Sequence, residues 1–369
     1  MNRLKTLEKL GQSIWLDYIR RDLISSGELQ RLIVDDGLSG ITSNPAIFAQ
    51  AFASGNIYGE SIKKLLQQGG DIEAIYDTLA QQDVGAAADE FRSLYEQTDG
   101  KEGYVSLEVN PYLANDAEGT IAEARRLWQA LDRPNLLIKV PGTEQGIIAL
   151  QQLISEGINV NVTLLFAVPR YAQIADAYIA GLGARLERDE PIDHIASVAS
   201  FFLSRIDTLL DPILQQHIDE EMEHVTLAKQ LQGQVAIASA KKAYQVFTEK
   251  FYGPSFQRLA KAGAKVQRLL WASTGTKDPR YSDVKYVDSV IAADTVNTLP
   301  MQTFKAYLDH GDPAPRLIED KGNILAAFDK LALLGIDMEK ICHQLEIEGI
   351  EKFNQAFDQL LDTLRQLKR

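Results

Sequence analysis

Lys139 stands in the middle of a short apolar segment, residues 135–142, with the sequence NLLIKVPG. Burying a charged amine is costly unless it is paired or neutralised, and a low-dielectric environment makes a lysine release its proton more easily. A neutral amine is a nucleophile that attacks a carbonyl carbon and forms an imine. The setting of Lys139 therefore favours Schiff-base chemistry, although a lysine at a sheet edge or in a structural ion pair would give the same pattern.

Polar residues also recur in other short apolar segments, where buried parallel strands usually carry Val, Ile and Leu. Side chains at every second position of a strand point the same way, so Asn159, Asn161 and Thr163 share one face of segment 158–166. We expect the polar residues that fall late in their segments to converge on one site with Lys139. These residues are Asp17, Asn44, Glu108, Asn161 and Thr163.

Eight short apolar or β-branched segments alternate with longer amphipathic stretches, which predicts an α/β protein with a parallel sheet closed into a (β/α)8 TIM barrel. Catalytic groups of such barrels sit at the carboxyl ends of the strands, which suits the late positions of the polar residues. The predicted strands lie within 13–19, 39–45, 104–110, 135–142, 158–166, 195–202, 268–274 and 294–300.

We expect one barrel domain over residues 1–369, with additional helices. The intervals near 46–103 and 208–267 are longer than a simple βα unit needs and predict helical insertions. Apolar spacing from about residue 312 onward predicts a C-terminal helical extension that packs outside the barrel or over one of its mouths. Thr143 is placed to cap the helix that follows segment 135–142.

Composition excludes several functional classes. The formal net charge of −13 argues against nucleic-acid binding, but a local basic pocket could still hold a phosphorylated small molecule. No apolar run is long enough for a membrane span and the N-terminus lacks the apolar core of a signal peptide, so we expect a cytoplasmic protein. The five histidines and the single cysteine, Cys342, show no metal-ligand spacing, and no phosphate-binding glycine loop occurs, so we expect no metal and no nucleotide.

Six motifs occur in order and at suitable spacing for a transaldolase: SGITSNPAIF, YVSLEVNPYLA, NLLIKVPGTEQG, INVNVTLLFAV, SFFLSRID and WASTGTKDP. The chain resembles this family from about residue 10 to residue 310. KVPGTEQG and WASTGTKDP resemble the bacterial branch that occurs alone or fused to glucose-6-phosphate isomerase, and we expect the stand-alone form.

The resemblance implies a barrel of the class I aldolase type that needs no metal or organic cofactor. Such an enzyme moves a dihydroxyacetone unit from a ketose phosphate, fructose 6-phosphate or sedoheptulose 7-phosphate, to an aldose phosphate in the non-oxidative pentose phosphate pathway. Sugar phosphates are then the partners, and the chain acts as a monomer or a homodimer.

Residue roles carry over from the family's motifs. The resemblance implies that Lys139 forms the Schiff base, that Asp17 transfers protons, and that Glu108 works with a water that Thr163 holds. The residues implied to bind the substrate are Asn44, Asn161, Ser200, Phe202 and Arg205.

The chain departs from the family after the seventh predicted strand, where better-known transaldolases carry a second phosphate-binding arginine. The segment WASTGTKDP has none, and Lys277 and Ser273 are the candidates for this role. Two residues also have simpler interpretations, because Asn44 before Pro45 is typical of a turn and Arg205 near Asp207 of a surface ion pair.

Two other functions fit the sequence. One is a fructose 6-phosphate aldolase-like lyase, which would release free dihydroxyacetone; that family is much shorter and typically uses a tyrosine and a water where Glu108 and its water would act here. The other is a non-catalytic barrel that binds sugar phosphates, in which Lys139 would be dispensable. The residues that would matter there are Asn44, Ser200 and Arg205.

Overall fold

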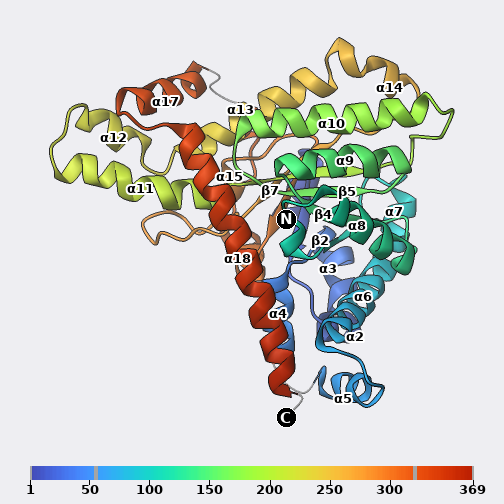
Figure 1. Cartoon of the computed structure of the whole chain (residues 1–369). Helices are drawn as coiled ribbons and strands as arrows, with labels where there is room; N and C mark the ends of the chain where they lie inside the picture. Colours follow the sequence, from blue (N-terminus) through green and yellow to red (C-terminus); the bar gives the residue numbers. More distant parts are fainter. Residues whose placement is uncertain (1, 54–56, 319–321, 368–369) are drawn as a thin grey trace.

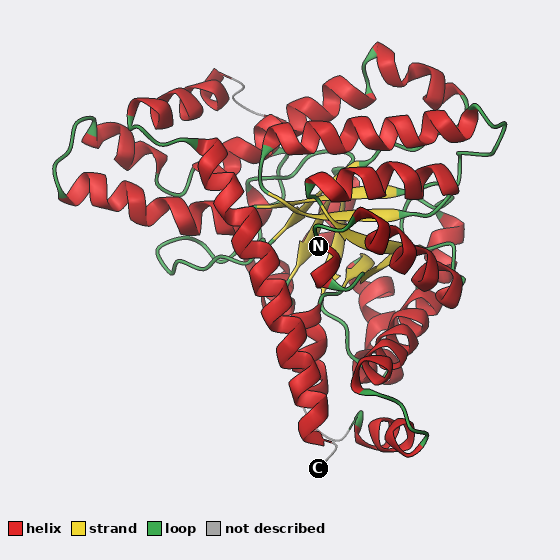
Figure 2. Cartoon of the chain, viewed as in Figure 1, coloured by secondary structure: helices red, strands yellow, loops and turns green. Residues whose placement is uncertain are grey.

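A closed barrel of parallel strands forms the centre of the molecule (Figure 2). The computed structural model describes residues 2–53, 57–318 and 322–367. Each strand pairs with the next along the chain, and the last pairs with the first, which closes the barrel. The predicted (β/α)8 fold is confirmed, and each of the eight predicted segments overlaps one strand, although the first two strands begin one residue before their segments. The strands are β1 (Gln12–Asp17), β2 (Leu38–Thr42), β3 (Tyr104–Glu108), β4 (Leu136–Pro141), β5 (Val160–Leu165), β6 (Ser197–Phe202), β7 (Arg268–Ala272) and β8 (Thr295–Leu299).

Helices surround the barrel on its outer side and extend beyond it (Figure 1). Of those in the described ranges, none combines the length and the apolarity needed to cross a bilayer. The helices of the first half are α1 (Arg3–Lys9), α2 (Arg21–Ser25), α3 (Glu28–Asp36), α4 (Pro45–Ala53), α5 (Gly59–Gln67), α6 (Ile72–Glu90), α7 (Arg92–Gln97), the 3-10 turn η1 (Pro111–Leu113), α8 (Ala117–Leu131) and α9 (Glu144–Glu156). The others are α10 (Val168–Leu186), α11 (Ser204–Asp219), α12 (Val225–Leu231), α13 (Val235–Phe251), η2 (Pro254–Phe256), α14 (Gln257–Lys261), α15 (Lys285–Asp288), α16 (Met301–His310), η3 (Arg316–Ile318), α17 (Gly322–Leu333) and α18 (Met338–Leu367).

Local sequence signals explain where several helices begin and end. Thr143 accepts a hydrogen bond from the backbone N–H of Gly146 and caps α9, as predicted. Gly157 ends that helix in the left-handed conformation that favours glycine. These two ends fix the short connections between β4, α9 and β5, and therefore the relative position of two neighbouring strands that carry polar residues.

Strand register brings three polar residues abreast. Glu108 on β3 is the partner of Lys139 on β4, and Lys139 is the partner of Asn161 on β5. Since side chains alternate along each strand, partners at equal height point to the same face, here the barrel interior. The inward row therefore follows from parity and register together.

The C-terminal helix α18 is 30 residues long and runs across the carboxyl ends of the barrel strands (Figure 1, red). It packs along α4 and also touches α6, α11, η1 and β5. The Sγ of Cys342 lies 3.4 Å from the carbonyl oxygen of Phe166, just beyond β5. The extension therefore covers the mouth toward which the predicted catalytic residues point.

A buried ion pair closes the opposite end of the barrel. The guanidinium of Arg268, the first residue of β7, lies 3.1 Å from a carboxylate oxygen of Glu102, which precedes β3. The same guanidinium donates to Ser13 Oγ on β1 at 2.7 Å and to the carbonyl oxygen of Lys101 at 2.7 Å. This network ties β1, β3 and β7 together below the polar row.

Replacing Glu102 by alanine should destabilise the protein by about 3–5 kcal/mol, because Arg268 would remain buried without its counter-charge. The measurement is the free energy of unfolding in urea. Glu96→Ala is the matched control, since it removes the partner of Arg92 in an exposed i,i+4 pair and should cost less than about 1 kcal/mol. Equal losses in the two variants would contradict a structural role of the buried pair.

Candidate active site

Lys139 lies inside the barrel and not at a sheet edge. Its side chain is buried, and its Nζ lies 3.8 Å from Glu108 Oε2 and donates to the carbonyl oxygen of Ser43 at 3.3 Å. At 3.8 Å the contact with Glu108 is electrostatic and leaves the amine free to approach another group. The structure therefore excludes the interpretation in which Lys139 extends into solvent. The interpretation that remains is a buried amine beside a carboxylate.

Glu108 is the closest carboxylate to this amine. Burial raises its pKa to about 7, the charge of Lys139 acts in the opposite direction, and the nearby Asp17 adds to the increase. Neither carboxylate oxygen accepts a hydrogen bond from a residue in the described ranges. Glu108 can therefore gain or lose a proton near neutral pH, which a group must do if it acts both as a general acid and as a general base.

Asp17 ends β1 on the other side of the mouth. Burial raises its pKa, while the charges of Lys139, Arg205 and Lys277 and a hydrogen bond from Thr42 oppose that increase. The hydroxyl of Thr42 donates to Asp17 Oδ1 at 2.7 Å and lies 2.7 Å from the hydroxyl of Thr298 on β8. Since Thr42 has one proton to give, Thr298 donates to Thr42, and this chain of hydroxyls orients the carboxylate.

Asn161 is held between two serines across the barrel interior. Its amide nitrogen donates to Ser106 Oγ on β3 at 3.0 Å, and its amide oxygen accepts from Ser200 Oγ on β6 at 2.7 Å. Ser200, a predicted substrate-binding residue, is thus engaged with Asn161 in this state. The arrangement fixes the plane of the amide beside Lys139.

Thr163 and its neighbour mark an irregularity near the end of β5. The pairing of β5 with β6 shifts between Val162 and Leu165, and Leu164 has a φ of +60°, which is rare and strained for a leucine. The hydroxyl of Thr163 is buried and has no hydrogen-bond partner among the described side chains and backbone groups. A polar atom of this kind needs a partner, and a small polar molecule is one.

Asn44 has a structural role at the mouth of the barrel, where it caps a helix. Its side-chain oxygen accepts a hydrogen bond from the backbone N–H of Ile47 at 3.1 Å and caps α4, which begins at Pro45. The interpretation of Asn44 as a turn residue is therefore correct for its local conformation. The residue remains partly exposed, two positions after the end of β2.

Arg205 lies in the first turn of α11 between two aromatic rings. Its guanidinium carbon is 5.0 Å from the ring centroid of Phe202 and 6.0 Å from that of Phe353, and burial lowers its pKa. Its buried Nη1 has no hydrogen-bond partner within the described ranges. An arginine beside a helix N-terminus with a free donor is suited to an anion.

The alternative of a surface ion pair between Arg205 and Asp207 is wrong. The Asp207 carboxylate is buried and accepts hydrogen bonds from Tyr286 at 2.8 Å and from the backbone of Ala236 at 2.8 Å, and it lies 3.3 Å from Lys285 Nζ. Asp207 therefore anchors α11 against the segment that follows β7, while Arg205 points away from it to the mouth.

Ser273 and Lys277 follow β7 and lie on the same side as Arg205. Ser273 has a φ of +53°, and its Oγ lies 2.9 Å from that of Ser204 at the start of α11. Lys277 is exposed, and its charge acts on Asp17. Tyr281 holds their loop by donating to Asp211 on α11 at 2.8 Å. Of the two candidates, Lys277 has the freedom to meet a substrate, whereas Ser273 is tied to α11.

Phe353 is a site residue that sequence analysis missed. It lies on α18, and its ring centroid is 5.8 Å from Lys139 Nζ. The apolar spacing of α18 indicated only an amphipathic helix, and no motif marked one of its rings. On the same helix, Glu346 is partly buried and lies 3.9 Å from Arg170.

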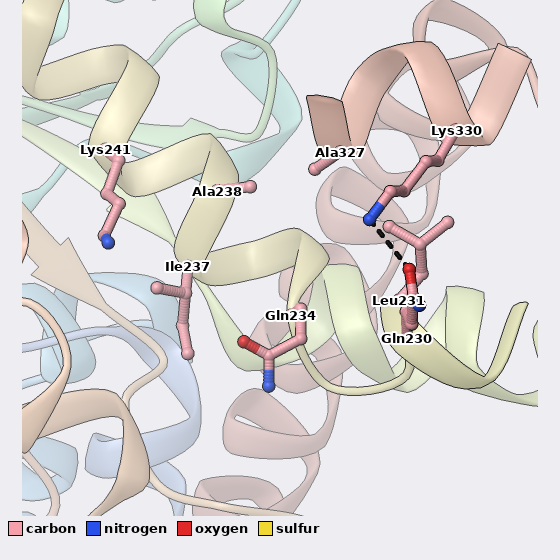
Figure 3. A pocket seen from close by; sticks show the side chains of 8 residues that line it. All are labelled: Gln230, Leu231, Gln234, Ile237, Ala238, Lys241, Ala327 and Lys330. Atoms are coloured by element: carbon pink, nitrogen blue, oxygen red, sulfur yellow. Dashed lines mark hydrogen bonds between the residues drawn. The ribbon is translucent and has the colours of Figure 1, made fainter. Parts of the chain in front are cut away.

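Of the hollows in the described part of the chain, one reaches this cluster and another lies away from it. One, of about 340 Å³, borders Glu108 from the side of α6, α8 and η1, with Tyr76 and Phe357 in its wall. The other, of about 240 Å³, lies between α12, α13 and α17 and shares no residue with the mouth (Figure 3); there Lys330 donates to Gln230 at 2.8 Å. In the part of the chain that the structure describes, no group of His, Cys, Asp and Glu has the arrangement of a metal site.

A closed (β/α)8 barrel with a buried lysine, two carboxylates and an arginine at its carboxyl mouth belongs to the class of α/β-barrel enzymes that act on carbonyl compounds. Residues 14–364 match the model of the transaldolase/fructose-6-phosphate aldolase family, and the chain belongs to this family. It is similar to proteins named transaldolase from Thiobacillus denitrificans (44% identity, covering 98% of this chain and 99% of the relative), Trichodesmium erythraeum (46%, 99% and 97%) and Neisseria gonorrhoeae (44%, 99% and 100%).

Replacing Glu108 by glutamine should change how stability depends on pH. The pKa of Glu108 is about 7 in the folded protein against 4.5 without burial, so its protonated form favours folding, and that contribution is lost as pH rises from about 4.5 to about 7. The glutamine variant stays neutral and should gain stability relative to the unmodified protein across this window, by at most about 1.4 kcal/mol per pH unit. Urea unfolding between pH 4.5 and pH 8 measures this, and a pH-independent difference would contradict the raised pKa.

Proposed function

We propose that this protein is a transaldolase that transfers a dihydroxyacetone unit between sugar phosphates through a Schiff base on Lys139. The observation that carries the proposal is the buried Lys139 amine, loosely paired with Glu108 and set in one row with Asn161. An amine in this setting can move away from its carboxylate and attack a ketone, because it is already buried and does not have to be desolvated first. The relatives named transaldolase, which cover nearly the whole chain, support the same activity.

Formation of the imine requires proton transfers next to Lys139. The amine adds to the C2 carbonyl of the donor to give a carbinolamine, which then loses water. Glu108 would give a proton to the departing hydroxyl, and Thr163, whose buried hydroxyl lacks a partner among described groups, would hold the water that carries it. A pKa of about 7 suits Glu108 to give this proton in one direction and to take it back in the other.

Carbon–carbon cleavage requires a base on the other side of the imine. Asp17 would take the proton of the C4 hydroxyl as the C3–C4 bond breaks, and the protonated imine would accept the electron pair left on C3. The acceptor aldehyde then forms a new bond to C3, and Asp17 returns its proton to the new hydroxyl. The hydroxyls of Thr42 and Thr298 would hold Asp17 in the orientation that both steps need.

The remaining polar residues would bind the ends of the substrate. Asn44 and Asn161 would hold the hydroxyls of the three-carbon unit, with Ser200 fixing Asn161 from behind. Arg205, packed on Phe202 at the start of α11, would bind the phosphate, and Lys277 would supply the second positive charge. Ser273 would act by joining its loop to α11 and by offering its hydroxyl to the phosphate.

The same proposal includes the partners, the cofactor requirement and the cellular location of the enzyme. Its partners would be sugar phosphates, no cofactor or metal would take part, and the protein would act in the cytoplasm as a monomer or a homodimer. The net charge of −13 offers no basic surface to a nucleic acid, and it does not prevent a local basic pocket from binding a phosphate.

Lys139→Met should abolish covalent trapping of fructose 6-phosphate by borohydride and reduce turnover to background, because the nucleophile is lost. A reduced adduct blocks tryptic cleavage after Lys139, so the modified peptide of the unmodified protein should run from residue 127 to residue 170. Mass spectrometry of that peptide is the measurement. The matched control is Lys265→Met, which removes a half-buried lysine bound to backbone carbonyls at the other end of the barrel and should leave trapping intact. Adding erythrose 4-phosphate should yield sedoheptulose 7-phosphate, whereas free dihydroxyacetone alone would indicate an aldolase.

Arg205→Met should raise KM for fructose 6-phosphate by about 10–100-fold, the effect of losing a hydrogen bond to a charged group. Turnover of unphosphorylated fructose should change little, because its contacts at Lys139 remain. Lys277→Met should have a smaller effect, about fivefold or less, since an exposed charge is screened by water. If Arg205→Met impaired both sugars equally, Arg205 would have another role than phosphate binding.

A further inference from the structure

The ring of Phe353 contacts both ends of the candidate active site. Its centroid lies 5.8 Å from Lys139 Nζ and 6.0 Å from the guanidinium carbon of Arg205, and the residue is only 7% exposed. Phe202 lies on the same guanidinium at 5.0 Å. Phe353 therefore lies near both cations, the amine and the guanidinium, that the proposed function assigns to the two ends of the substrate.

Several contacts fix α18 in this position. Glu346 lies 3.9 Å from Arg170 before Phe353, and Tyr112 donates to Asp358 at 2.7 Å after it. One turn before Phe353, Gly349 lets the helix lie directly on the end of β5, since a Cβ there would come within 3.0 Å of Leu164 Cδ2. The ring is thus held by a helix that is anchored on both sides of the mouth.

The ring suits a cation that forms at the Lys139 nitrogen. Before cleavage of the donor sugar, this nitrogen belongs to a protonated imine that carries a positive charge. Cleavage turns the imine into a neutral enamine, and the positive charge returns once C3 has been protonated. An aromatic face stabilises such a cation, more strongly where water is excluded, and offers no hydrogen bond that would compete with the substrate. A phenylalanine also keeps water away from the carbon atom that hydrolysis attacks.

Resting on the proposed transaldolase function, we infer that Phe353 is a substrate-contacting residue that decides whether the bound three-carbon unit is transferred or released. Release requires protonation of the C3 carbanion and then addition of water across the C=N bond, which yields dihydroxyacetone and free Lys139. Phe353 disfavours the second step by covering the imine.

The test compares Phe353→Leu and Phe353→Ala with the unmodified full-length enzyme, supplied with fructose 6-phosphate and erythrose 4-phosphate. Free dihydroxyacetone and sedoheptulose 7-phosphate are quantified in the same reaction, so that their ratio does not depend on the fraction of active enzyme. The ratio should rise about tenfold in Phe353→Leu, as expected when a desolvated cation loses an aromatic face, and further in Phe353→Ala, where water also enters.

Phe357→Leu is the matched control, because Phe357 lies one turn further along α18, is equally buried, and packs on Tyr76 and Tyr112. Its ratio should equal that of the unmodified enzyme. An unchanged ratio in both Phe353 variants, or an equal rise in Phe357→Leu, would overturn the inference. If the unmodified enzyme formed neither sedoheptulose 7-phosphate nor an adduct on Lys139, the proposed function itself would fail.

Discussion

The site is organised around one energetic problem, the burial of the Lys139 amine inside a protein barrel. A buried ammonium is tolerated only beside compensating charge, and Glu108 and Asp17 provide it from the ends of β3 and β1. Burial raises the pKa of both carboxyls, that of Glu108 to about 7, so Glu108 can exchange a proton near neutral pH as well as balance charge. The same low dielectric that makes this arrangement costly supplies the conditions for imine chemistry.

Much of this arrangement could be predicted from sequence, because successive side chains of a strand always point to opposite faces of the sheet. Once β3, β4 and β5 were recognised as parallel neighbours, parity placed Glu108, Lys139 and Asn161 on the inner face, and the register confirms that they are abreast. Parity does not say which polar groups pair. The links of Asn161 to Ser106 and Ser200 depend on distances across the barrel that no local pattern encodes.

The phosphate end was harder to predict, because it is built from loops and a helix terminus. The alternation of side chains along a strand does not apply there, and the direction of Arg205 depends on which residues bind the Asp207 carboxylate. Asp207 is engaged by Lys285 and Tyr286, residues about 80 positions further along the chain, and this frees Arg205 to face the mouth between Phe202 and Phe353. Such long-range competition for a carboxylate cannot be inferred from the motif SFFLSRID alone.

The contribution of α18 depends on two backbone features that meet at one point. Leu164 holds a left-handed conformation that is strained for its type, and the nearest atom to a hypothetical Cβ on Gly349 is the Leu164 side chain. A regular β5 would have directed residue 164 elsewhere, and a side chain at 349 would press on the Leu164 side chain. The bulge at the end of β5 therefore serves two purposes, because it follows directly on the buried hydroxyl of Thr163 and provides the surface on which α18 brings Phe353 over Lys139. Leu164 therefore links the row of polar residues inside the barrel to the helix α18 that covers it. A change at Leu164 or at Gly349 would affect both.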